Sequence, residues 1–517
     1  MTNNFFVTSP IYYVNDAPHI GHAYTSIACD VLARFHRLKN HQVFFLTGTD
    51  EHGQKVEKSA SNKSKNPQQF CDEVSQKFRE LATFLNLSND DFIRTTDERH
   101  KKTVTKIWEI LQKNGYIYKD IYEGWYAVRD EAFYNADEII DGKAPTGAEV
   151  SWHREESYFF RLSAFQDKLL TLYEAVPDFI RPLSRYNEVV SFVKSGLKDL
   201  SISRTSFSWG IKVPNDEKHV IYVWLDALFN YISALNFDNN SNENSAQLFQ
   251  NFWNNATKSP IHIVGKDIVR FHAVYWPAFL MACDLNLPYG IYAHGWWTNE
   301  GQKISKSVGN IIDPLTEIQW LKSFGLSQET AIDYFRYFLM REVPFGNDGD
   351  YSRNNLILRL NSELVNNIGN LVQRCMTMIY KNCDGKIPIS MEHSKTHIEP
   401  FIENYFQAFD DLSFDKALQA IIDYADLVNK RFNDQAPWSL FKNGKIKEMH
   451  ISLHETAEAI RLIAILLKPF IPNLSSKILD LLNMPKNADF TKLLDNFADN
   501  HQINEPKIIF PRLEKYS

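Results

Sequence analysis

The sequence predicts an α/β protein whose parallel-sheet domain is split by an inserted domain and followed by an all-α bundle. Three observations predict this fold class. A strand–helix–strand pattern occupies the first 50 residues, the pattern resumes after about residue 215, and helical stripes run from about residue 352. Alternating strands and helices are typical of a parallel sheet covered by helices.

The first element is the apolar run Phe5–Val7, which predicts a strand, and a loop containing Pro10 and Pro18 follows. Gln42–Leu46 predicts a buried strand that ends at Thr47–Asp50. Strand, helix and strand in this order predict a βαβ unit. The helix between the strands is indicated by apolar residues at helical spacing on one face: Ile27, Ala28, Val31, Leu32 and Phe35.

Residues 116–215 differ in character, with short Tyr- and Trp-containing runs between glycines. We expect an insertion of mixed structure there, with Trp125–Val128 as a strand. The α/β pattern resumes in the apolar runs 219–224, 261–264 and 290–293, each a predicted strand. The Asn- and Ser-rich stretch 236–247 predicts a surface loop.

Further along, apolar residues follow helical spacing nearly to the end, which predicts a bundle that packs on itself. One such stripe is Leu356, Leu360, Leu364, Ile368 and Leu371. The predicted segments are 1–115 for the first half of a Rossmann-like domain, 116–215 for the insertion, 216–295 for the second half, 296–351 for a connector and 352–517 for the bundle.

Composition limits the compartment and the partners. The net charge of −7 excludes a protein that coats nucleic acid through bulk positive charge, but leaves room for local basic patches. The five cysteines form no C-x-x-C pair, which disfavours disulfides and cysteine zinc knuckles and favours a reducing cytosol. The N-terminal stretch lacks the basic region of a signal peptide, and 459–472 is too short and charged to span a bilayer. We expect a soluble, cytoplasmic protein.

Two histidines flank a glycine where the first strand hands over to the helix, at His19-Ile20-Gly21-His22. Helix N-terminal amides favour an anion there, and Gly21 lets a ligand approach the backbone. The two imidazoles would donate hydrogen bonds to a phosphate as charge develops on it. Taken alone, the motif also fits two capping or core histidines.

A second candidate phosphate site lies between Gly301 and Gly309. Lysine is a compact, mobile charge suited to phosphates, and flanking glycines would let such a loop swing. By itself, a K-x-S-K motif is more typical of a solvated basic loop. The polar residues of this segment are Lys303, Ser305, Lys306 and Ser307.

Together, the HIGH tetrapeptide and the later KISKS segment resemble the signature motifs of class I aminoacyl-tRNA synthetases. KISKS differs from the family's commoner KMSKS only by Ile304 in place of Met. Further segments over most of the chain are similar to the methionyl-tRNA synthetase family: Pro10–Asn15, Gly48–Gly53, Val223–Ala227 and Gly265–His272.

The resemblance implies a ligase that activates methionine with ATP to methionyl-adenylate and transfers methionine to tRNA(Met). Catalysis of this kind is positioning plus charge stabilisation, with Mg²⁺ arriving on the ATP. Asp267 would read the ribose. The implied catalytic residues are His19, His22, Lys303 and Lys306. The implied ATP site is His19, Gly21, His22, Gly265, Asp267, Lys303, Ser305, Lys306 and Ser307.

For methionine, the resemblance implies that Asp50 holds the substrate ammonium by a charge-assisted hydrogen bond. Aromatic neighbours suit a thioether, and Tyr13 and His272 would sense its sulfur. Arg204 resembles an arginine that supports the active site. Each aromatic residue taken singly is also consistent with core packing. The implied methionine site is Asp50 with Ile11, Tyr13, Trp224, Ala227, Leu228, Tyr231, Ile268 and His272.

In the bundle, Asn370 and Arg374 lie four residues apart on one helix face, and Gln435–Trp438 ends another helical stretch. These positions resemble the family's anticodon readers. Asn370 and Arg374 would bond base edges, and Trp438, beside Pro437, would stack on a base. Without the catalytic motifs, an exposed salt-bridge face and a buried Trp would be the preferred interpretation.

Two departures from the family carry expectations. Many members bind zinc through cysteine knuckles in the insertion, but no Cys occurs between Cys71 and Cys283, so we expect no zinc. Some members append a tRNA-binding, dimer-forming domain at the C-terminus. The sequence after Pro511 leaves no room for one, and we therefore expect a monomer.

Other functions fit less well. Synthetases for leucine, isoleucine or valine need a large editing domain, because one methylene gives only about 1–3 kcal/mol of discrimination, and the insertion is too small for one. A cysteine-specific synthetase typically uses metal ligands that are not evident. A smaller HIGH-type nucleotidyltransferase would leave the bundle unexplained, and a dinucleotide dehydrogenase would need G-x-G-x-x-G after the first strand. An inactive RNA-binding paralogue should have lost the phosphate-binding residues, which are all present.

Overall fold

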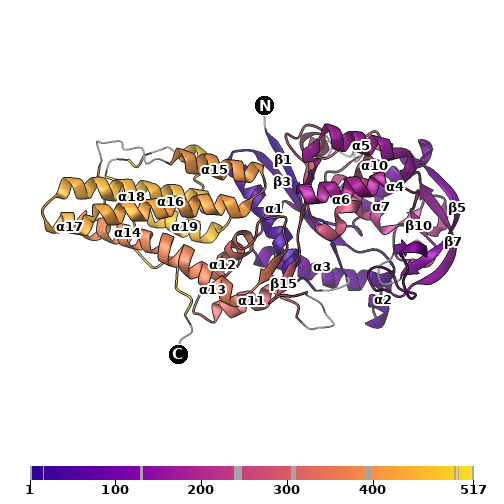
Figure 1. The fold of residues 1–517 in the computed structure, drawn as a ribbon, viewed down its shortest axis with the longest axis horizontal. Helices are drawn as coiled ribbons and strands as arrows, with labels where there is room; N and C mark the ends of the chain where they lie inside the picture. Colours follow the sequence, from indigo (N-terminus) through magenta and orange to yellow (C-terminus); the bar gives the residue numbers. More distant parts are fainter. Residues whose placement is uncertain are drawn as a thin grey trace. The chain divides into compact units, whose positions relative to one another are not determined.

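A computed structural model describes residues 3–14, 17–127, 132–134, 136–237, 247–303, 310–389, 398–493, 496–498 and 500–514. The chain forms two compact units, residues 1–18 with 43–293 and residues 19–42 with 294–517 (Figure 1). Within the described residues, no helix is long and apolar enough to cross a membrane.

The first unit is built on a sheet that has seven strands over the described residues. β1 (Asn4–Thr8) pairs in parallel with β13 (Ile261–Gly265). The strand order is β2, β3, β1, β13, β14, β8, and β4 pairs with β3. β1 is buried along its whole length, as expected of a strand covered on both faces. The other strands are β2 (Tyr12–Tyr13), β3 (Gln42–Asp50), β4 (Asp91–Arg94), β8 (Ile180–Arg181) and β14 (Gly290–His294).

The centre of this sheet is a topological switch point. β1 and β13 are neighbours, and the sheet extends from β1 to β3 on one side and from β13 to β14 on the other. In open α/β sheets, ligands bind outside the carboxyl ends of strands at such a point. The segments that leave these ends contain Pro10 and Gly265–Asp267. The predicted parallel α/β domain is confirmed.

The insertion contains an antiparallel sheet in the order β6, β5, β7, β9. Trp125 lies opposite Trp152, and the two rings meet edge-on with centroids 5.5 Å apart. Aromatic packing of this kind is worth about 0.5–1.5 kcal/mol beyond burial. The strands are β5 (Ile117–Ala127), β6 (Ala132–Tyr134), β7 (Ser151–Phe160) and β9 (Leu200–Ser201).

The predicted strand at 219–224 is present only over residues 219–221, and it is antiparallel instead of part of the parallel sheet. β12 (Asp216–Ile221) belongs to a small antiparallel sheet with β10 (Ser203–Arg204) and β11 (Lys212–Val213), and Val223 already begins helix α7 (Val223–Leu228). A short apolar run has no periodicity that separates a strand from a buried helix. A helix, not a strand, therefore carries Trp224 and Ala227, two of the residues predicted to line the methionine site.

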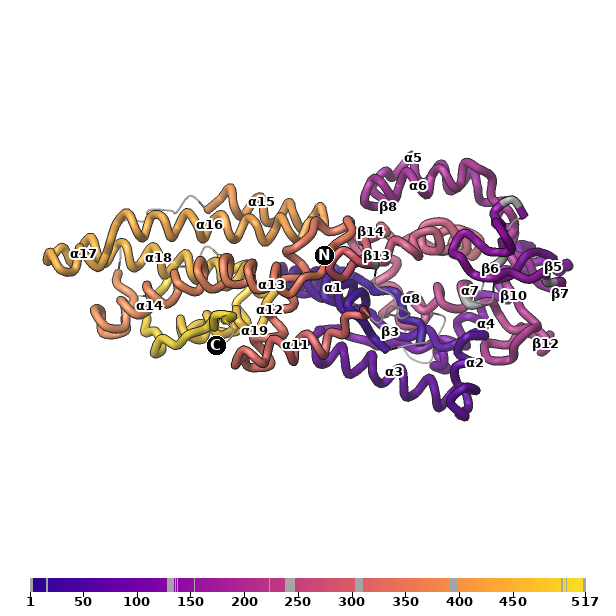
Figure 2. Tube along the Cα trace, turned by 60° about the horizontal axis from the view of Figure 1, so that its bottom comes forward, coloured from indigo at the N-terminus to yellow at the C-terminus, as the bar shows by residue number. Residues whose placement is uncertain are grey.

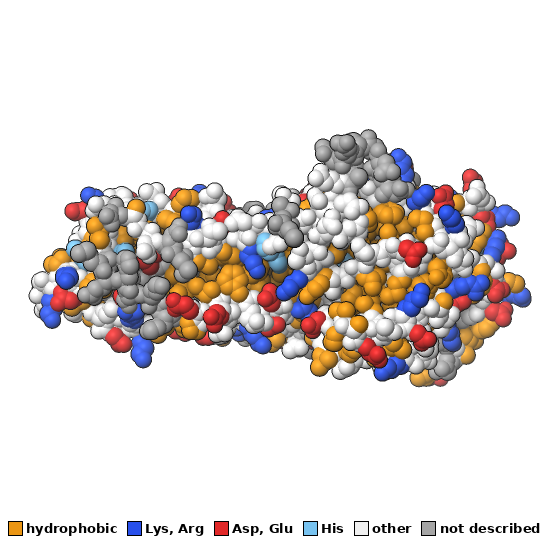
Figure 3. Space-filling view, turned by 90° about the horizontal axis from the view of Figure 1, so that it is seen from above, with side chains coloured by type: hydrophobic (Ala, Val, Ile, Leu, Met, Phe, Trp, Pro, Cys, Tyr) orange, Lys and Arg blue, Asp and Glu red, His pale blue; other side chains and the backbone are white. Residues whose placement is uncertain are grey.

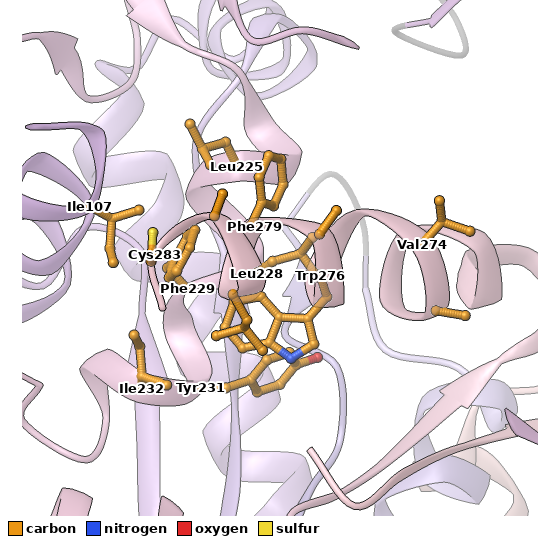
Figure 4. Close-up of a cluster of buried hydrophobic side chains, with 14 of the residues drawn as sticks. Ile107, Leu225, Leu228, Phe229, Tyr231, Ile232, Val274, Trp276, Phe279 and Cys283 are labelled. Carbon is orange, nitrogen blue, oxygen red and sulfur yellow. The ribbon is translucent and has the colours of Figure 1, made fainter. Parts of the chain in front are cut away.

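The first unit also contains helices that lie beside the parallel sheet, whereas the insertion strands β5 and β7 lie at the outer edge of this unit (Figure 1). The helices of the first unit include α2 (Gln54–Asn62), α3 (Pro67–Phe84), α4 (Glu98–Lys113), α5 (Gln166–Ala175), α6 (Leu183–Lys194), α8 (Asn230–Ser233) and α10 (Trp276–Ala282). One large apolar core joins α4, α5, α6, α7, α8 and α10, and Figure 4 shows part of it. Buried residues of α2 and α3 belong to a second, smaller cluster.

The second unit contains α1 (Ile20–Leu38), the helix that follows the HIGH histidines. α1 packs on α12 (Gln328–Arg341), where the buried Arg336 guanidinium donates to the Asp30 carboxylate at 2.6 Å. Phe35 of α1 also stacks on Phe409, with centroids 3.8 Å apart. α1 is thus attached to C-terminal parts of the chain. The five-segment division expected from the sequence stays a prediction.

The remainder of the second unit is a helical bundle, in which α16 (Phe414–Gln435) and α18 (Ile446–Leu467) run side by side (Figure 2). The predicted stripe from Leu356 to Leu371 is helical and buried, and its middle, Leu360–Gly369, winds as a π-helix. The other helices include α11 (Pro314–Lys322), α13 (Arg353–Arg359), α14 (Asn370–Asn382), α15 (Glu399–Asp410), α17 (Pro437–Lys442) and α19 (Pro472–Leu481).

Candidate functional site

His19 and His22 form a reciprocal cap at the start of α1. His19 Nδ1 accepts from the Gly21 amide at 3.1 Å, and His22 Nδ1 accepts from the His19 amide at 3.0 Å. Desolvation and the neighbouring His19 lower the pKa of His22 well below its usual value, so this ring is neutral at pH 7. Because each Nδ1 accepts, each neutral ring carries its proton on Nε2. The capping interpretation is therefore correct for Nδ1, and Nε2 is still a donor suited to a phosphate.

The KISKS segment is reached through a small three-stranded sheet of β16 (Gln302–Lys303), β15 (Trp297–Asn299) and β17 (Gly349–Tyr351). Asn299 of β15 donates to the Asn310 carbonyl at 3.1 Å, which ties the two ends of the segment together. The Ile312 carbonyl then accepts from the Ile20 amide of α1 at 2.9 Å. The described residues that follow the KISKS segment thus bond to the first residue of α1. The Lys303 side chain, Ser305, Lys306 and Ser307 lie outside the described residues.

In the first unit, two adjacent carboxylates at the end of β3 have different surroundings. Glu51 accepts two hydrogen bonds from Arg94, at 2.7 and 2.8 Å, and one from Thr96 at 2.6 Å. Asp50 is buried opposite Tyr13 of β2 in the parallel register. Glu51, the residue after β3, is thus held by the scaffold, whereas Asp50 is the last residue of β3.

Five of the predicted methionine residues belong to the large apolar core or pack against it, whereas Tyr13 packs against the smaller cluster. Trp224 stacks on Phe271 with centroids 3.6 Å apart and planes 9° from parallel. Ile11, Trp224 and Ile268 are half-buried against the core, whereas Leu228 and Tyr231 lie inside it (Figure 4). These residues come from a loop, two helical segments and the turn after β13, and they all pack in or against the same core.

Tyr231 and His272 form a buried polar pair whose hydrogen-bond direction is fixed. His272 Nδ1 lies 3.0 Å from the Ile268 carbonyl, which can only accept, so Nδ1 carries the proton. Burial lowers the pKa of His272 to about 4, so the ring is neutral at pH 7. Its Nε2 therefore accepts from the Tyr231 hydroxyl at 2.7 Å. The pair is polar but uncharged, as a slot for a thioether requires.

Gly265, Asp267 and Arg204 complete the predicted residues of this unit. Gly265 ends β13, and Asp267 is exposed in the 3₁₀ turn that follows, on the ligand side of the sheet. Arg204 is buried, donates to Ser201 Oγ at 2.7 Å, and places its guanidinium 4.4 Å from the Tyr222 ring. Tyr222 is the N-cap of α7, so Arg204 supports the helix that carries Trp224.

Several residues that the structure brings to this site have no role predicted from the sequence. Phe271 is the stacking partner of Trp224. Asp226 is fully buried and accepts from His52 Nδ1 at 2.6 Å and from His100 Nε2 at 2.7 Å. The signals for Phe271, Asp226 and His52 lie within the motif segments, between residues that did receive roles. His100 lies in no such segment, and only its tertiary contacts reveal it.

On the bundle, Arg374 of α14 and Trp438 of α17 are in contact. The Arg374 guanidinium lies 4.7 Å from the Trp438 ring centroid and 5.3 Å from that of Phe432, and it donates to Asn433 at 2.9 Å. Trp438 is 39% exposed, so the interpretation of a buried Trp is wrong. Asn370 is exposed at the first residue of α14. A partly open aromatic face beside a cation suits stacking of an unpaired base.

The expectation that Gln435–Trp438 ends a helix is wrong in one respect. α16 ends at Gln435, Ala436 adopts a left-handed conformation with φ of 44°, and the buried Pro437 begins α17. A left-handed residue stops a helix, and proline suits the first helical position because it needs no amide donor. This sharp junction places Trp438 beside Arg374.

The described residues contain no group of three or more His, Cys, Asp or Glu placed to hold a metal ion. On the face drawn in Figure 3, basic and acidic side chains are interspersed over the surface. The absence of zinc and the presence of local basic patches both stay predictions.

Comparison with known proteins adds to these observations. A family model described as class I tRNA synthetases (M) matches residues 5–151 and 146–376. A second, described as the anticodon binding domain of methionyl tRNA ligase, matches residues 387–516. Together with the parallel sheet and the capped HIGH helix, these matches define a class I aminoacyl-tRNA synthetase.

Full-length relatives identify the amino acid. Methionine–tRNA ligase of Rickettsia conorii is 55% identical to this chain, over 99% of it and 100% of the relative. That of Brucella suis is 48% identical, over 98% of each chain. The chain belongs to the methionine–tRNA ligase family, and it joins methionine to tRNA.

Solved structures agree. Mycobacterium tuberculosis methionyl-tRNA synthetase in complex with methionyl-adenylate superimposes with a TM-score of 0.92 at 43% identity, over 99% of this chain and 100% of that one. The apo form of the same enzyme gives a TM-score of 0.86 at 40% identity, over 99% of each chain. The anticodon match and the adenylate of the first structure fit an enzyme that uses ATP and reads a tRNA anticodon.

Proposed function

We propose that this ligase forms methionyl-adenylate from methionine and Mg²⁺–ATP and then charges tRNA(Met), and that it acts in the cytoplasm as a monomer without zinc. The observation that carries this assignment is the first-unit site. Buried Asp50 marks an end for the ammonium group, and the uncharged Tyr231–His272 pair with Trp224 marks an end for an apolar side chain.

In the first step, an oxygen of the methionine carboxylate attacks the α-phosphorus of ATP, and the bond to pyrophosphate breaks. His19 and His22 donate from Nε2 to the phosphates, which their capped tautomers support. Lys303 and Lys306 stabilise the charge that gathers on pyrophosphate. Gly21 and Gly265 let the nucleotide approach the backbone, Asp267 binds the ribose hydroxyls, and Ser305 and Ser307 bond phosphate oxygens.

The methionine side chain enters a slot that is lined by aromatic, apolar and uncharged polar groups. Trp224 and the Tyr231–His272 pair contact the thioether, where each sulfur–aromatic contact contributes about 0.3–1.5 kcal/mol. The rest of the slot is apolar and excludes charged side chains by desolvation. Its remaining members are Ile11, Tyr13, Ala227, Leu228 and Ile268.

In the second step, a terminal ribose hydroxyl of tRNA attacks the carbonyl carbon of the adenylate, and AMP leaves. The anticodon is held on the bundle, where Trp438 stacks on one base while Asn370 and Arg374 bond base edges. Pro437 sets the position of Trp438. The contact between Arg374 and Trp438 supports this arrangement.

ATP–pyrophosphate exchange, measured with each of the amino acids in turn, tests the proposal. Methionine should stimulate exchange best, and a different preferred amino acid would overturn the assignment. Lys306→Ala should reduce exchange by roughly 100-fold or more, because stabilisation of the developing charge is lost. Elemental analysis of the purified protein should find no zinc, and light scattering at micromolar concentration should give a monomer mass.

A further inference from the structure

Behind the methionine slot lies a buried carboxylate that the reaction described above does not use. Asp226 is on α7, between Trp224 and Ala227, and its side chain has no exposed surface. Its neighbours Leu225 and Phe229 are packed into the apolar core (Figure 4). A charge in such surroundings is destabilising unless it is fully paired.

Two histidines from distant parts of the first unit pair this carboxylate. His52 Nδ1 lies 2.6 Å from one oxygen, and His100 Nε2 lies 2.7 Å from the other. His100 Nδ1 in turn lies 2.8 Å from the Ser233 hydroxyl. His52 is 3% exposed, and His100 and Ser233 are fully buried, so water does not compete for these hydrogen bonds.

The partners of Asp226 carry the other parts of the methionine site. His52 is two residues after Asp50, in a turn also held by Trp209, whose indole donates to the Glu51 carbonyl at 2.6 Å. Ser233 is on α8, two residues after Tyr231. One carboxylate thus connects the turn of Asp50, the helix of Trp224 and the helix of Tyr231, with His100 of α4 as the bridge.

Stability alone does not account for a charge at this position. Well-packed apolar residues are often as stabilising as a buried ion pair, or more so, whereas a polar cluster fixes geometry. An enzyme site needs its groups held within about 0.5 Å, and buried partners provide that precision. The Asp226 carboxylate, hydrogen-bonded to the imidazoles of His52 and His100, meets this requirement. Apolar contacts alone would let the connected segments shift relative to one another.

We propose that Asp226 is a positioning residue for methionine: through His52 and His100 it holds the turn of Asp50 at a fixed distance from Trp224 and Tyr231. It thereby matches the length of the slot to methionine. This inference rests on the proposed roles of Asp50 and Trp224.

The test measures steady-state ATP–pyrophosphate exchange by Asp226→Asn, which keeps the size of the side chain but removes the charge and one acceptor. The KM for methionine should rise about tenfold or more, while the KM for ATP stays within about twofold. The matched control is Glu363→Gln in the second unit, another carboxylate with several partners, Tyr337 and Arg341 among them. Its melting temperature should fall without any change in the KM for methionine.

A second pair of variants keeps the inference falsifiable if Asp226→Asn does not fold. His100→Gln retains a donor toward Asp226 and His100→Leu does not, so the glutamine variant should have the smaller increase in KM for methionine. Equal KM values for the two variants, or an Asp226→Asn enzyme with a KM for methionine within about twofold of the parent, would overturn the inference. Asp50→Asn distinguishes failure of the positioning role of Asp226 from failure of the proposed methionine pocket. If Asp50→Asn raises this KM and Asp226→Asn does not, only the positioning role fails. If Asp50→Asn has no effect, the proposed pocket itself is wrong.

Discussion

The proposed methionine pocket and the proposed anticodon surface use aromatic and polar side chains in opposite environments. In the pocket, Tyr231 and His272 are 1% and 2% exposed, and the direction of their hydrogen bond is fixed. On the bundle, Trp438 is 39% exposed and its ring lies against the Arg374 guanidinium. The ligands explain the difference, because a small amino acid is enclosed whereas RNA bases are splayed onto an open face.

This difference has an energetic consequence. A polar group in the pocket is left buried without a partner when its neighbour is removed, and that loss costs about 1–3 kcal/mol for a neutral group and more for a charge. A group on the bundle surface regains water when its neighbour is removed. Substitutions in the pocket should therefore be severe and specific to methionine, and those on the bundle milder and specific to tRNA.

The largest effect should come from Asp50→Asn. The substrate ammonium would enter a buried site without its charge partner, a loss of about 3–5 kcal/mol that corresponds to roughly 100-fold to 4000-fold in kcat/KM for methionine. Exchange kinetics with varied methionine measure it. The KM for ATP is the internal control, and an equal loss for both substrates would argue against an ammonium site at Asp50.

The contributions of two buried carboxylates, Asp333 of the second unit and Asp226 of the first, to the free energy of unfolding should depend on pH with opposite signs. Burial raises the pKa of Asp333, in α12 of the second unit, to about 6, so its contribution to stability is present below pH 3.8 and is lost as pH rises through 6. Burial alone would raise the pKa of Asp226 too, but His52 and His100 lower it to about 2, so its contribution is present above pH 3.8 and is lost only as pH falls toward 2.

Urea unfolding at pH 4.5 and pH 7.5 checks these opposite signs. The parent should lose about 2 kcal/mol of second-unit stability over this interval through Asp333, and Asp333→Asn should not show that loss. The difference between the parent and Asp226→Asn should be nearly the same at both pH values. A pH-dependent difference for Asp226→Asn would mean that its carboxylate titrates in this range, contrary to the paired geometry.

The sequence predicts those parts of the fold that depend on local patterns. The strands at Phe5–Val7 and 261–264 are present because short apolar runs beside glycine and proline favour buried parallel strands. The stripe from Leu356 to Leu371 is helical because its spacing buries one face. The candidate site residues that lie in motifs could also be predicted, because each motif is a continuous stretch of sequence.

What could not be predicted depends on contacts between distant segments. The run 219–224 reads as one strand, and only the antiparallel partners of β12 divide it from α7. Ala436 adopts a left-handed conformation, but the sequence has no glycine at this position that would predict it. The pairing of Asp226 with His100 joins positions 126 residues apart, and no periodicity encodes such a separation. Local patterns therefore predict the residues that we propose contact the substrate, and tertiary contacts reveal those that lie behind them.

Tyr231→Phe should have an intermediate effect. The ring remains but the hydroxyl that donates to His272 Nε2 is lost, and a buried acceptor without a partner costs about 2 kcal/mol. The KM for methionine should rise by roughly 10-fold to 30-fold with little change in the KM for ATP. Exchange by Phe271→Leu provides a comparison, because it removes stacking on Trp224 but no hydrogen bond. A Tyr231→Phe enzyme that matches the parent would show that the polar pair is not part of the slot.

The smallest effect should come from Trp438→Ala on the bundle. Loss of one stacked base costs about 1–2 kcal/mol, so kcat/KM for tRNA should fall roughly 5-fold to 30-fold while ATP–pyrophosphate exchange is unchanged. Phe441→Ala is the matched control, because Phe441 lies on the same short helix and is 44% exposed, and it should leave charging within about twofold of the parent. Equal losses from both substitutions would attribute the effect to α17 as a whole. Lost exchange in folded Trp438→Ala protein would contradict the separation of the two regions, because an exposed stacking surface should not alter an enclosed slot in the other unit.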